Sequence, residues 1–163
     1  MQKSPQEKVM SLAEASAWRE TLRKEGRSLV LTNGCFDLLH RGHAEYLMRA
    51  RSEGGALIAL INSDASVRAL KGPTRPVNTE ADRAFLLACM QFIDAVCVFN
   101  GERCTREIAA LSPDVYVKGG DYTVDKLDPE ERSAILGAKA RIAFIPFVDG
   151  LSTTKILEKA AQK

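Results

Sequence analysis

The chain has 163 residues, of which 45% are hydrophobic and 27% are charged, and its formal net charge is +2. This length and composition predict one globular domain with a full core. The small net charge argues against a nucleic acid or an acidic membrane surface as partner, and no apolar run reaches the roughly 18 residues of a membrane span. Four cysteines without CxxC spacing and a polar N-terminus without a signal-peptide core predict reduced thiols and a cytoplasmic location.

The first predicted element is a helix between Ser11 and Gly26. Ser11 and Glu14 have the spacing of a capping box, and Gly26 is the predicted C-cap. Between them, apolar residues recur on one helical face at Leu12, Ala15, Trp18 and Leu22. We expect residues 1–27 to form an N-terminal helix packed on a domain made by residues 28–163, although a dimer contact would show the same apolar face.

A turn that carries the only two histidines of the chain follows the first predicted strand, residues 29–31. His40 and His43 lie on either side of Gly42, and an amphipathic helical pattern follows them. Such a strand-turn-helix unit directs backbone N–H groups and two imidazoles to a point above the end of the strand, which suits an anion. A single histidine here would more often only begin the helix. Two of them, with Gly34 and Gly42 freeing the backbone, favour a binding site.

Four further predicted strands alternate with helical patterns. They are residues 56–61, 94–99, 115–117 and 142–145. The strand at 56–61 is apolar without alternation, as in a strand buried on both faces. Strands that alternate with helices predict an α/β fold: a single Rossmann-like, doubly wound domain with a five-stranded parallel sheet.

Polar segments follow these strands, at residues 33–43, 62–64, 118–122 and 149–154. The carboxyl ends of parallel strands share one edge of the sheet, so we expect these segments to line one cleft. Residues 71–76 form a basic segment with two prolines and a glycine. This segment is either a solvated surface loop or a mobile lid beside the cleft, and the sequence leaves both interpretations open.

The predicted cleft contains donors and cations: His40, His43, Lys71, Arg83, Lys118 and helix N-termini at Gly42 and Ser152. The sequence offers no Ser-His-Asp set, no zinc-ligand cluster, no GxGxxG turn and no GK[ST] signature. Two histidines three residues apart could bind a metal, but no third or fourth ligand is evident. The set fits transfer between phosphates, in which an ionised phosphate oxygen attacks without a strong general base and Mg²⁺ bridges other phosphate oxygens.

Two motifs carry a family resemblance. Residues 36–43 resemble the HxGH signature of the nucleotidyltransferase superfamily, and residues 152–154 resemble its C-terminal STT motif. Within it, the closer likeness is to the D-glycero-β-D-manno-heptose 1-phosphate adenylyltransferases. That likeness runs from about Ser28 to Lys159 and rests on the segments 32–37, 62–67, 70–72, 75–78, 117–122 and 149–150.

The resemblance implies a role for each matching position. His40 and His43 would hold the ATP phosphates and stabilise the transition state, and Lys71 would neutralise phosphate charge. Asp37 would orient either Mg²⁺ or the opening turn. The implied nucleotide-binding residues are Gly34, Cys35, Phe36, His40, Gly42, His43, Lys118, Gly120, Asp121, Ser152, Thr153 and Thr154. The implied substrate-binding residues are Asn33, Lys71 and Arg83.

Two departures bear on the nucleotide. Cytidylyltransferases of the glycerol-phosphate type carry an arginine and a threonine where this chain has Phe147 and Val148, and a threonine where it has Cys35. The likeness therefore implies that ATP and a heptose 1-phosphate give ADP-heptose and pyrophosphate, for the lipopolysaccharide core, in a homodimeric enzyme. The alternatives are a cytidylyltransferase acting on glycerol 3-phosphate or a similar alcohol phosphate, and a non-catalytic nucleotide sensor.

Overall fold

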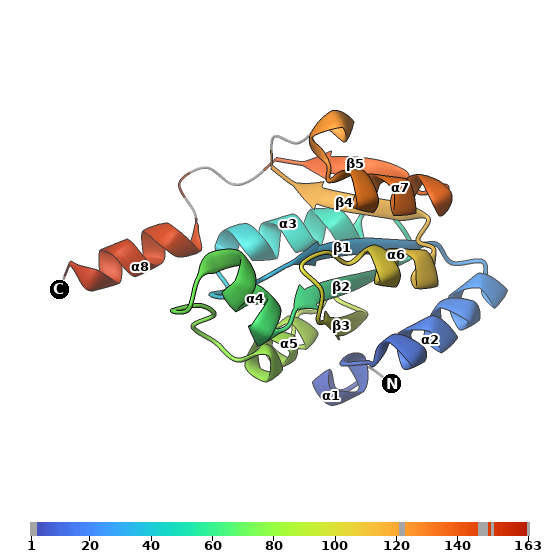
Figure 1. The fold of residues 1–163 in the computed structure, drawn as a ribbon. Coiled ribbons are helices and arrows are strands. Elements are labelled where there is room, and N and C mark those ends of the chain that lie inside the picture. The colour runs from blue at the N-terminus through green and yellow to red at the C-terminus, as the bar shows by residue number, and fades with distance from the viewer. Residues whose placement is uncertain (1–2, 121–122, 147–149, 151, 163) are drawn as a thin grey trace.

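Five parallel strands form the centre of the molecule in a computed structural model that describes residues 3–120, 123–146, 150 and 152–162 (Figure 1). Their order in the sheet is β3-β2-β1-β4-β5, and every neighbouring pair is parallel. The prediction of a doubly wound five-stranded α/β domain is confirmed. The strands are β1 (Leu29–Gly34), β2 (Ala56–Asn62), β3 (Ala95–Phe99), β4 (Val115–Gly119) and β5 (Arg141–Ile145).

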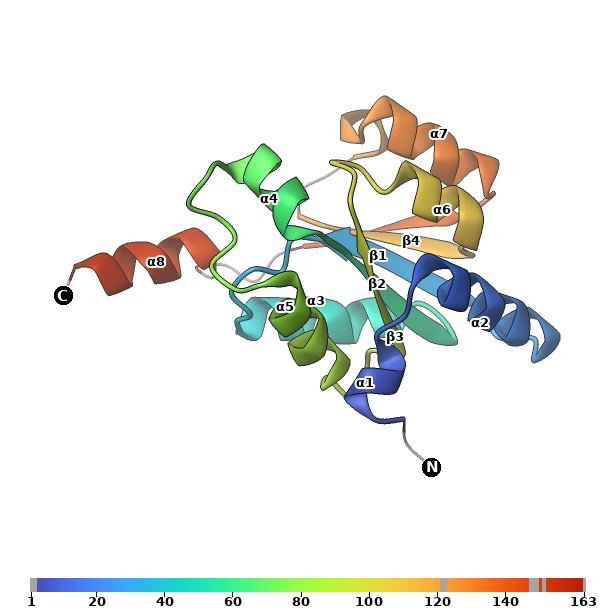
Figure 2. The same cartoon turned by 60° about the horizontal axis from the view of Figure 1, so that its bottom comes forward.

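Helices cover both faces of this sheet. Those described are α1 (Pro5–Lys8), α2 (Leu12–Lys24), α3 (Arg41–Arg51), α4 (Asp64–Lys71), α5 (Glu80–Ala88), α6 (Thr105–Leu111), α7 (Pro129–Gly137) and α8 (Thr153–Ala161), with a 3₁₀ turn, η1 (Val124–Lys126). Apolar residues of α3 and α5 form one core cluster with one face of the sheet, and those of α2, α6 and α7 form a second cluster with the other face. Figure 2 shows α6 and α7 on one side of the sheet and α3 and α5 on the opposite side.

The winding reverses between β1 and β4. From β1 the chain passes through α3 on one face to β2, whereas from β4 it passes through α7 on the other face to β5. The two strands are paired neighbours, so their connections leave in opposite directions. In open α/β sheets a crevice for ligands forms outside the carboxyl ends of the strands at such a point.

Residues 3–27 contain two helices, α1 and α2, where the sequence pattern indicated one. Ser4 and Ser11 each cap a helix in a capping box. Gly26 adopts a φ of +66°, and the N–H groups of Gly26 and Arg27 donate to Arg23 and Leu22, which ends α2 in a Schellman motif. Ala15 and Leu22 are buried in the core beside α6, and Trp18 packs against the same cluster. Between the two helices, Val9 forms a parallel bridge with Val96 of β3, and the N–H of Met10 donates to the carbonyl of Val96 at 2.9 Å.

Helix α4 was not predicted. The sequence interpretation treated residues 62–64 as polar groups facing a ligand, but the Ser63 hydroxyl caps α4 and accepts the N–H of Ser66 at 3.3 Å. Gly72, with a φ of +94°, then ends the helix. Lys71 is therefore the last residue of a helix rather than part of the irregular basic segment, which begins after it.

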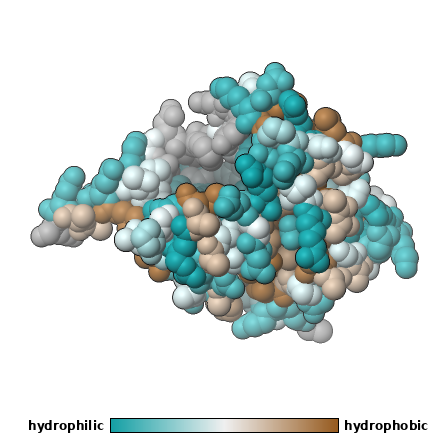
Figure 3. Space-filling model, in the orientation of Figure 1, coloured by the Kyte–Doolittle hydropathy of each residue, from teal (hydrophilic) through white to brown (hydrophobic). Residues whose placement is uncertain are grey.

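Helix α8 stands clear of the main body, as Figures 1 and 3 show, and none of its described residues is buried. On the face seen in Figure 3, hydrophobic residues are scattered among hydrophilic ones. No helix within the described ranges is both long and apolar enough to cross a lipid bilayer.

Candidate active site

A cleft of about 680 Å³ opens at the carboxyl ends of β1 and β4. Most residues that the sequence singled out line it: Asn33, Gly34, Cys35, Phe36, Asp37, His40, Gly42, His43, Lys71, Lys118, Ser152, Thr153 and Thr154. The cleft also includes Asn62, Leu70, Arg75 and Gly119, which belong to segments that the sequence pointed to, and Tyr46, Glu102, Arg103 and Glu131, which it did not single out. The expected convergence of the strand ends on one cleft is present in the structure.

A strained turn between β1 and α3 forms one side of this cleft. We call this side the histidine wall (residues 36–43). Phe36 has a φ of +47°, which is unusual for a residue with a side chain, and its ring is buried against the His43 ring with the centroids 5.4 Å apart. A Cβ on Gly34 would lie only 3.0 Å from the Phe36 ring. Gly34 therefore leaves room for the folded-back Phe36 ring, and a side chain at this position would press on that ring.

The two imidazoles lie one above the other at the start of α3. Their centroids are 3.9 Å apart with 27° between the ring planes. The His40 N–H donates to His43 Nδ1 at 3.4 Å, so a neutral His43 carries its proton on Nε2. Burial, and next the charges of His40 and Lys71, lower the pKa of His43 to about 4, and burial also lowers the pKa of His40. Both shifts favour the neutral form of the rings near pH 7, a point that the sequence alone left open.

His40 has an unsatisfied atom. Its Nδ1 is buried, and within the described part of the chain it has no hydrogen-bond partner. A buried polar atom without a partner costs about 1–3 kcal/mol. The histidine wall therefore contains hydrogen-bonding capacity that the described protein residues do not use.

Asp37 ties the histidine wall to the basic segment. Its side chain is almost fully buried and accepts from Arg75 Nε at 2.5 Å, from the Val77 N–H at 2.8 Å and from the Asn78 N–H at 3.1 Å. Burial raises the pKa of this carboxyl, but the donors at Asn78, Arg75 and Val77 outweigh burial and hold the pKa below its usual range. Both carboxylate oxygens are thus occupied by protein donors. This geometry fits the orientation of the turn and does not fit a role as a Mg²⁺ ligand.

Arg83 does not line the cleft, although the resemblance implied that it binds substrate. It is completely buried, and its guanidinium donates to Asn78 O at 3.1 Å, Cys35 O at 2.6 Å and Asp64 Oδ1 at 2.8 Å. A side chain held in this way cannot reach a phosphate in the cleft. In this structure Arg83 instead joins the turn that follows β1, the start of α4 and the residues just after the basic segment.

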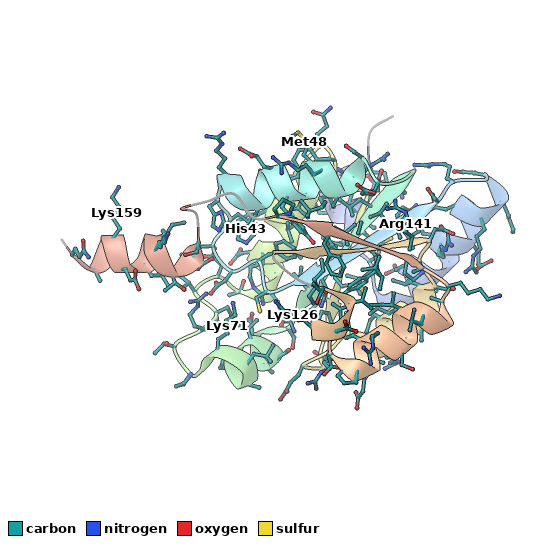
Figure 4. All side chains as sticks on the ribbon, turned by 90° about the horizontal axis from the view of Figure 1, so that it is seen from above. His43, Met48, Lys71, Lys126, Arg141 and Lys159 are labelled. Carbon is teal, nitrogen blue, oxygen red and sulfur yellow. The ribbon has the colours of Figure 1, made fainter. Side chains whose placement is uncertain are left out.

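Lys71 and the start of α8 lie near the histidines. Figure 4 shows Lys71 and His43 on the side of the molecule from which α8 projects. Lys71 is exposed at the end of α4. The Ser152 hydroxyl caps α8 by accepting the Lys155 N–H at 3.1 Å, and Thr153 Oγ1 donates to the carbonyl of Leu38 at 3.4 Å. A helix N-terminus and an ammonium group thus border the histidine wall, an arrangement that attracts anions.

The opposite side of the cleft is a connected polar cluster, which we call the β4 wall (Asn33, Tyr116, Lys118 and Glu131). Asn33 Oδ1 accepts from Tyr116 at 2.8 Å and from Lys118 at 3.3 Å. Glu131 lies 3.5 Å from Lys118 Nζ and accepts from Asn33 Nδ2 at 3.4 Å. Sequence reasoning missed Tyr116 and Glu131, because Tyr116 belongs to a predicted strand and Glu131 lies in the first turn of a helix, where carboxylates are common.

The remaining predicted residues differ in placement. Gly120 lies beside the cleft lining, with a φ of +104° and its N–H donating to Ile145 at 2.9 Å. Asp121 lies outside the described residues. Cys35 Sγ lies 3.7 Å from the amide oxygen of Asn62. Over the described ranges, no group of three or more histidine, cysteine or carboxylate side chains is arranged to hold a metal ion.

Comparison with known proteins gives consistent matches. Residues 31–159 match the family described as cytidylyltransferase-like. The chain is 49% identical over 141 residues to the bifunctional protein HldE of Trichlorobacter lovleyi, covering 86% of this chain and 28% of that protein. It is 43% identical over 157 residues to the bifunctional protein HldE of Methylococcus capsulatus, covering 96% of this chain and 33% of that protein. The chain thus spans about a third of the length of these curated relatives.

A solved structure shares the fold. It is described as the lipopolysaccharide core biosynthesis protein from Thermoplasma volcanium, and it superposes with a TM-score of 0.61 at 24% sequence identity. The match covers 76% of this chain and 98% of the other. At this identity the likeness supports the architecture alone.

Proposed function

The chain belongs to the cytidylyltransferase-like family, and we propose that it transfers the adenylyl group of ATP to D-glycero-β-D-manno-heptose 1-phosphate, giving ADP-heptose and pyrophosphate. The observation that carries this proposal is the pair of stacked, neutral imidazoles in a cleft bordered by an ammonium group and a helix N-terminus. The identity of 40–49% to HldE proteins over most of this chain supports the choice of substrate.

In the proposed reaction, an oxygen of the sugar phosphate attacks the α-phosphorus of ATP. A new P–O bond forms, the bond between the α-phosphorus and the bridging oxygen to the β-phosphate breaks, and pyrophosphate leaves with that electron pair. The attacking oxygen is already ionised near neutral pH, so the reaction needs no strong general base. Catalysis then depends on positioning and on donors that meet developing charge.

The histidine wall and the groups that border it match these needs. His43 Nε2–H is a preorganised donor for a phosphate oxygen, because its Nδ1 accepts from the backbone. Lys71 supplies positive charge at the end of a helix, next to a segment that Asp37 anchors. The N–H groups at the start of α8 and the hydroxyls of Ser152 and Thr154 offer further donors to phosphate.

We expect Mg²⁺ to enter as part of the MgATP substrate, held by the phosphates. The engaged Asp37 carboxylate does not fit a resident metal site, and no other described cluster does. The reaction therefore should require Mg²⁺ in proportion to ATP, with no metal retained by the purified protein.

Pyrophosphate release decides between the candidate functions. The protein is incubated with ATP or CTP and with a panel of sugar 1-phosphates, glycerol 3-phosphate and no acceptor. We expect turnover only with ATP and a heptose 1-phosphate. Turnover with CTP and not ATP would establish the cytidylyltransferase alternative, and nucleotide binding without turnover on any acceptor would establish a sensor.

The setting of the reaction is part of the same proposal. We propose a cytoplasmic enzyme that supplies activated heptose for the lipopolysaccharide core and works as a homodimer. Light scattering coupled to gel filtration tests the dimer: a mass near 36 kDa is expected, because one chain weighs 17.9 kDa.

A further inference from the structure

We propose that Glu131 is a positioning residue that fixes the ammonium group of Lys118 and the amide of Asn33 as one unit on the β4 wall. Its catalytic consequence rests on the function proposed above. Its structural consequence does not, and the experiments below separate the two.

The contacts of Glu131 reach across three elements. It belongs to the first turn of α7, yet its Oε2 lies 3.5 Å from Lys118 Nζ on β4 and its Oε1 accepts from Asn33 Nδ2 on β1 at 3.4 Å. Cys104 Sγ, just before α6, lies 3.7 Å from the same Oε1. One carboxylate therefore connects the two strands that flank the point where the winding reverses.

The helix alone does not explain this residue. Asp128 already caps α7 by accepting the N–H groups of Glu130 and Glu131, and Glu130 supplies a carboxylate to the same turn from an exposed position. Either residue would favour the positive end of the helix dipole. Glu131, in contrast, is only 5% exposed, and burying a carboxylate is unfavourable unless it is paired. Its burial points to its partners in the cleft.

The charge of Glu131 matters for Lys118. The Lys118 side chain is 20% exposed and that of Glu131 is 7% exposed, so water screens their attraction less than it would at the surface. Tyr116 and Asn33 provide further contacts to the ammonium group at 3.3 Å. With Glu131 present, Lys118 has a defined position in the cleft before any ligand arrives.

The orientation of the Asn33 amide follows from the same contact. Its Oδ1 accepts from Tyr116 and Lys118, and its Nδ2 donates to Glu131, so the amide cannot rotate by half a turn without facing donors with donors. The same three contacts therefore fix Asn33 and Lys118 together, both of which line the cleft.

The first experiment needs no activity. The Asn33 side-chain amide is followed by NMR in the ligand-free protein and identified by its loss in Asn33→Ala. We expect Glu131→Gln to move this resonance and to speed its exchange with water, whereas the matched control Glu130→Gln leaves it in place. An unmoved Asn33 resonance in a folded Glu131→Gln protein would overturn the proposal, whatever the protein catalyses.

The second experiment measures the consequence for the reaction. Glu131→Gln should raise KM for ATP about tenfold with a smaller change in kcat, as expected when a hydrogen bond to a charged group is weakened. In a Lys118→Met background the same change should have a smaller effect, about threefold or less. An undiminished effect in that background would show that Glu131 acts otherwise and would overturn the proposal. Absence of turnover in the unmodified protein would instead defeat the proposed function, and the NMR result would still decide the role of Glu131.

Discussion

The two walls of the cleft differ in how far the described protein contacts satisfy their polar groups. On the β4 wall, described protein contacts hold the Asn33 amide, the Lys118 ammonium group and the Glu131 carboxylate in a connected cluster. On the histidine wall, within the described part of the chain, His40 Nδ1 is buried without a partner. The described residues thus pair the polar groups of the β4 wall with one another, whereas they leave one buried nitrogen of the histidine wall without a partner. Under the proposed function, the β4 wall would hold the nucleotide in a fixed position and the histidine wall would face the charge that develops on the phosphates.

The largest effect should come from the histidine wall. His40→Ala and His43→Ala should each lower kcat on the order of 10²-fold or more, because each removes a preorganised imidazole from the site of phosphate charge. Pyrophosphate release under saturating ATP measures this loss, and circular dichroism checks that α3 remains folded. A change of less than about fivefold in either variant would remove the distinction between the two walls.

A smaller effect should come from Asp37, which links the histidine wall to the basic segment. Asp37→Asn should lower the free energy of unfolding by about 2 kcal/mol, because it weakens a buried ion pair with Arg75 and keeps the size of the side chain. Urea denaturation measures the loss. The concentration of Mg²⁺ at half-maximal activity should not change, and a large rise in it would indicate a metal ligand instead.

Lys71→Ala should lower kcat by about tenfold and raise KM less. This result is expected if the ammonium group contacts charge that develops in the transition state. Initial rates over a range of ATP and sugar phosphate concentrations separate the two constants. Lys155→Ala, on the exposed part of α8, is a control for the loss of one surface charge. An unchanged kcat in Lys71→Ala would leave the end of α4 without a catalytic role.

A further effect should be on the pH dependence of stability. A free histidine takes up a proton near pH 6.5 in the unfolded chain, whereas folded His43 stays neutral until about pH 4. Between these values the unfolded state binds more protons, so stability should fall as the pH is lowered. Urea midpoints at pH 7 and pH 5 measure this fall without ligand. It should be smaller in His43→Gln, and an equal fall would mean that His43 titrates normally.

The sequence predicted the sheet and the cleft well, for a physical reason. A strand that is buried on both faces has a continuous apolar sequence, which is easy to recognise. In a parallel sheet the carboxyl ends of the strands lie at one edge, so the position of the cleft follows from the order of strands and helices. Helix α4 was missed because its polar start at Ser63 and Asp64 looks like a ligand-facing strand end. Such a hydroxyl accepts a backbone N–H if the next residues fold into a helical turn, and it is available to a ligand if they do not.

The roles of individual side chains were harder to predict. The charges of Arg83 and Glu131 suit either a ligand or a protein partner. Which of the two each side chain contacts depends on how its helix is rotated about its axis, and the sequence does not give that rotation. The Asp37 carboxylate accepts hydrogen bonds from Arg75, Val77 and Asn78. These residues are distant in the sequence, so only the tertiary fold brings them to Asp37. The motif resemblance pointed to a turn that lines the cleft, but the contacts within that turn depend on the tertiary fold.

The bridge between Val9 and Val96 has a consequence for solubility. β3 is an outer strand of the sheet and is almost entirely apolar, so its unpaired side could pair with strands of other chains. The segment at Val9 and Met10 covers part of that side with backbone hydrogen bonds. A chain that starts at Ser11 should therefore aggregate at concentrations at which the full chain remains dispersed in light scattering. The short N-terminal segment would then prevent β3 from pairing with strands of other chains. This role would be independent of the chemistry in the cleft.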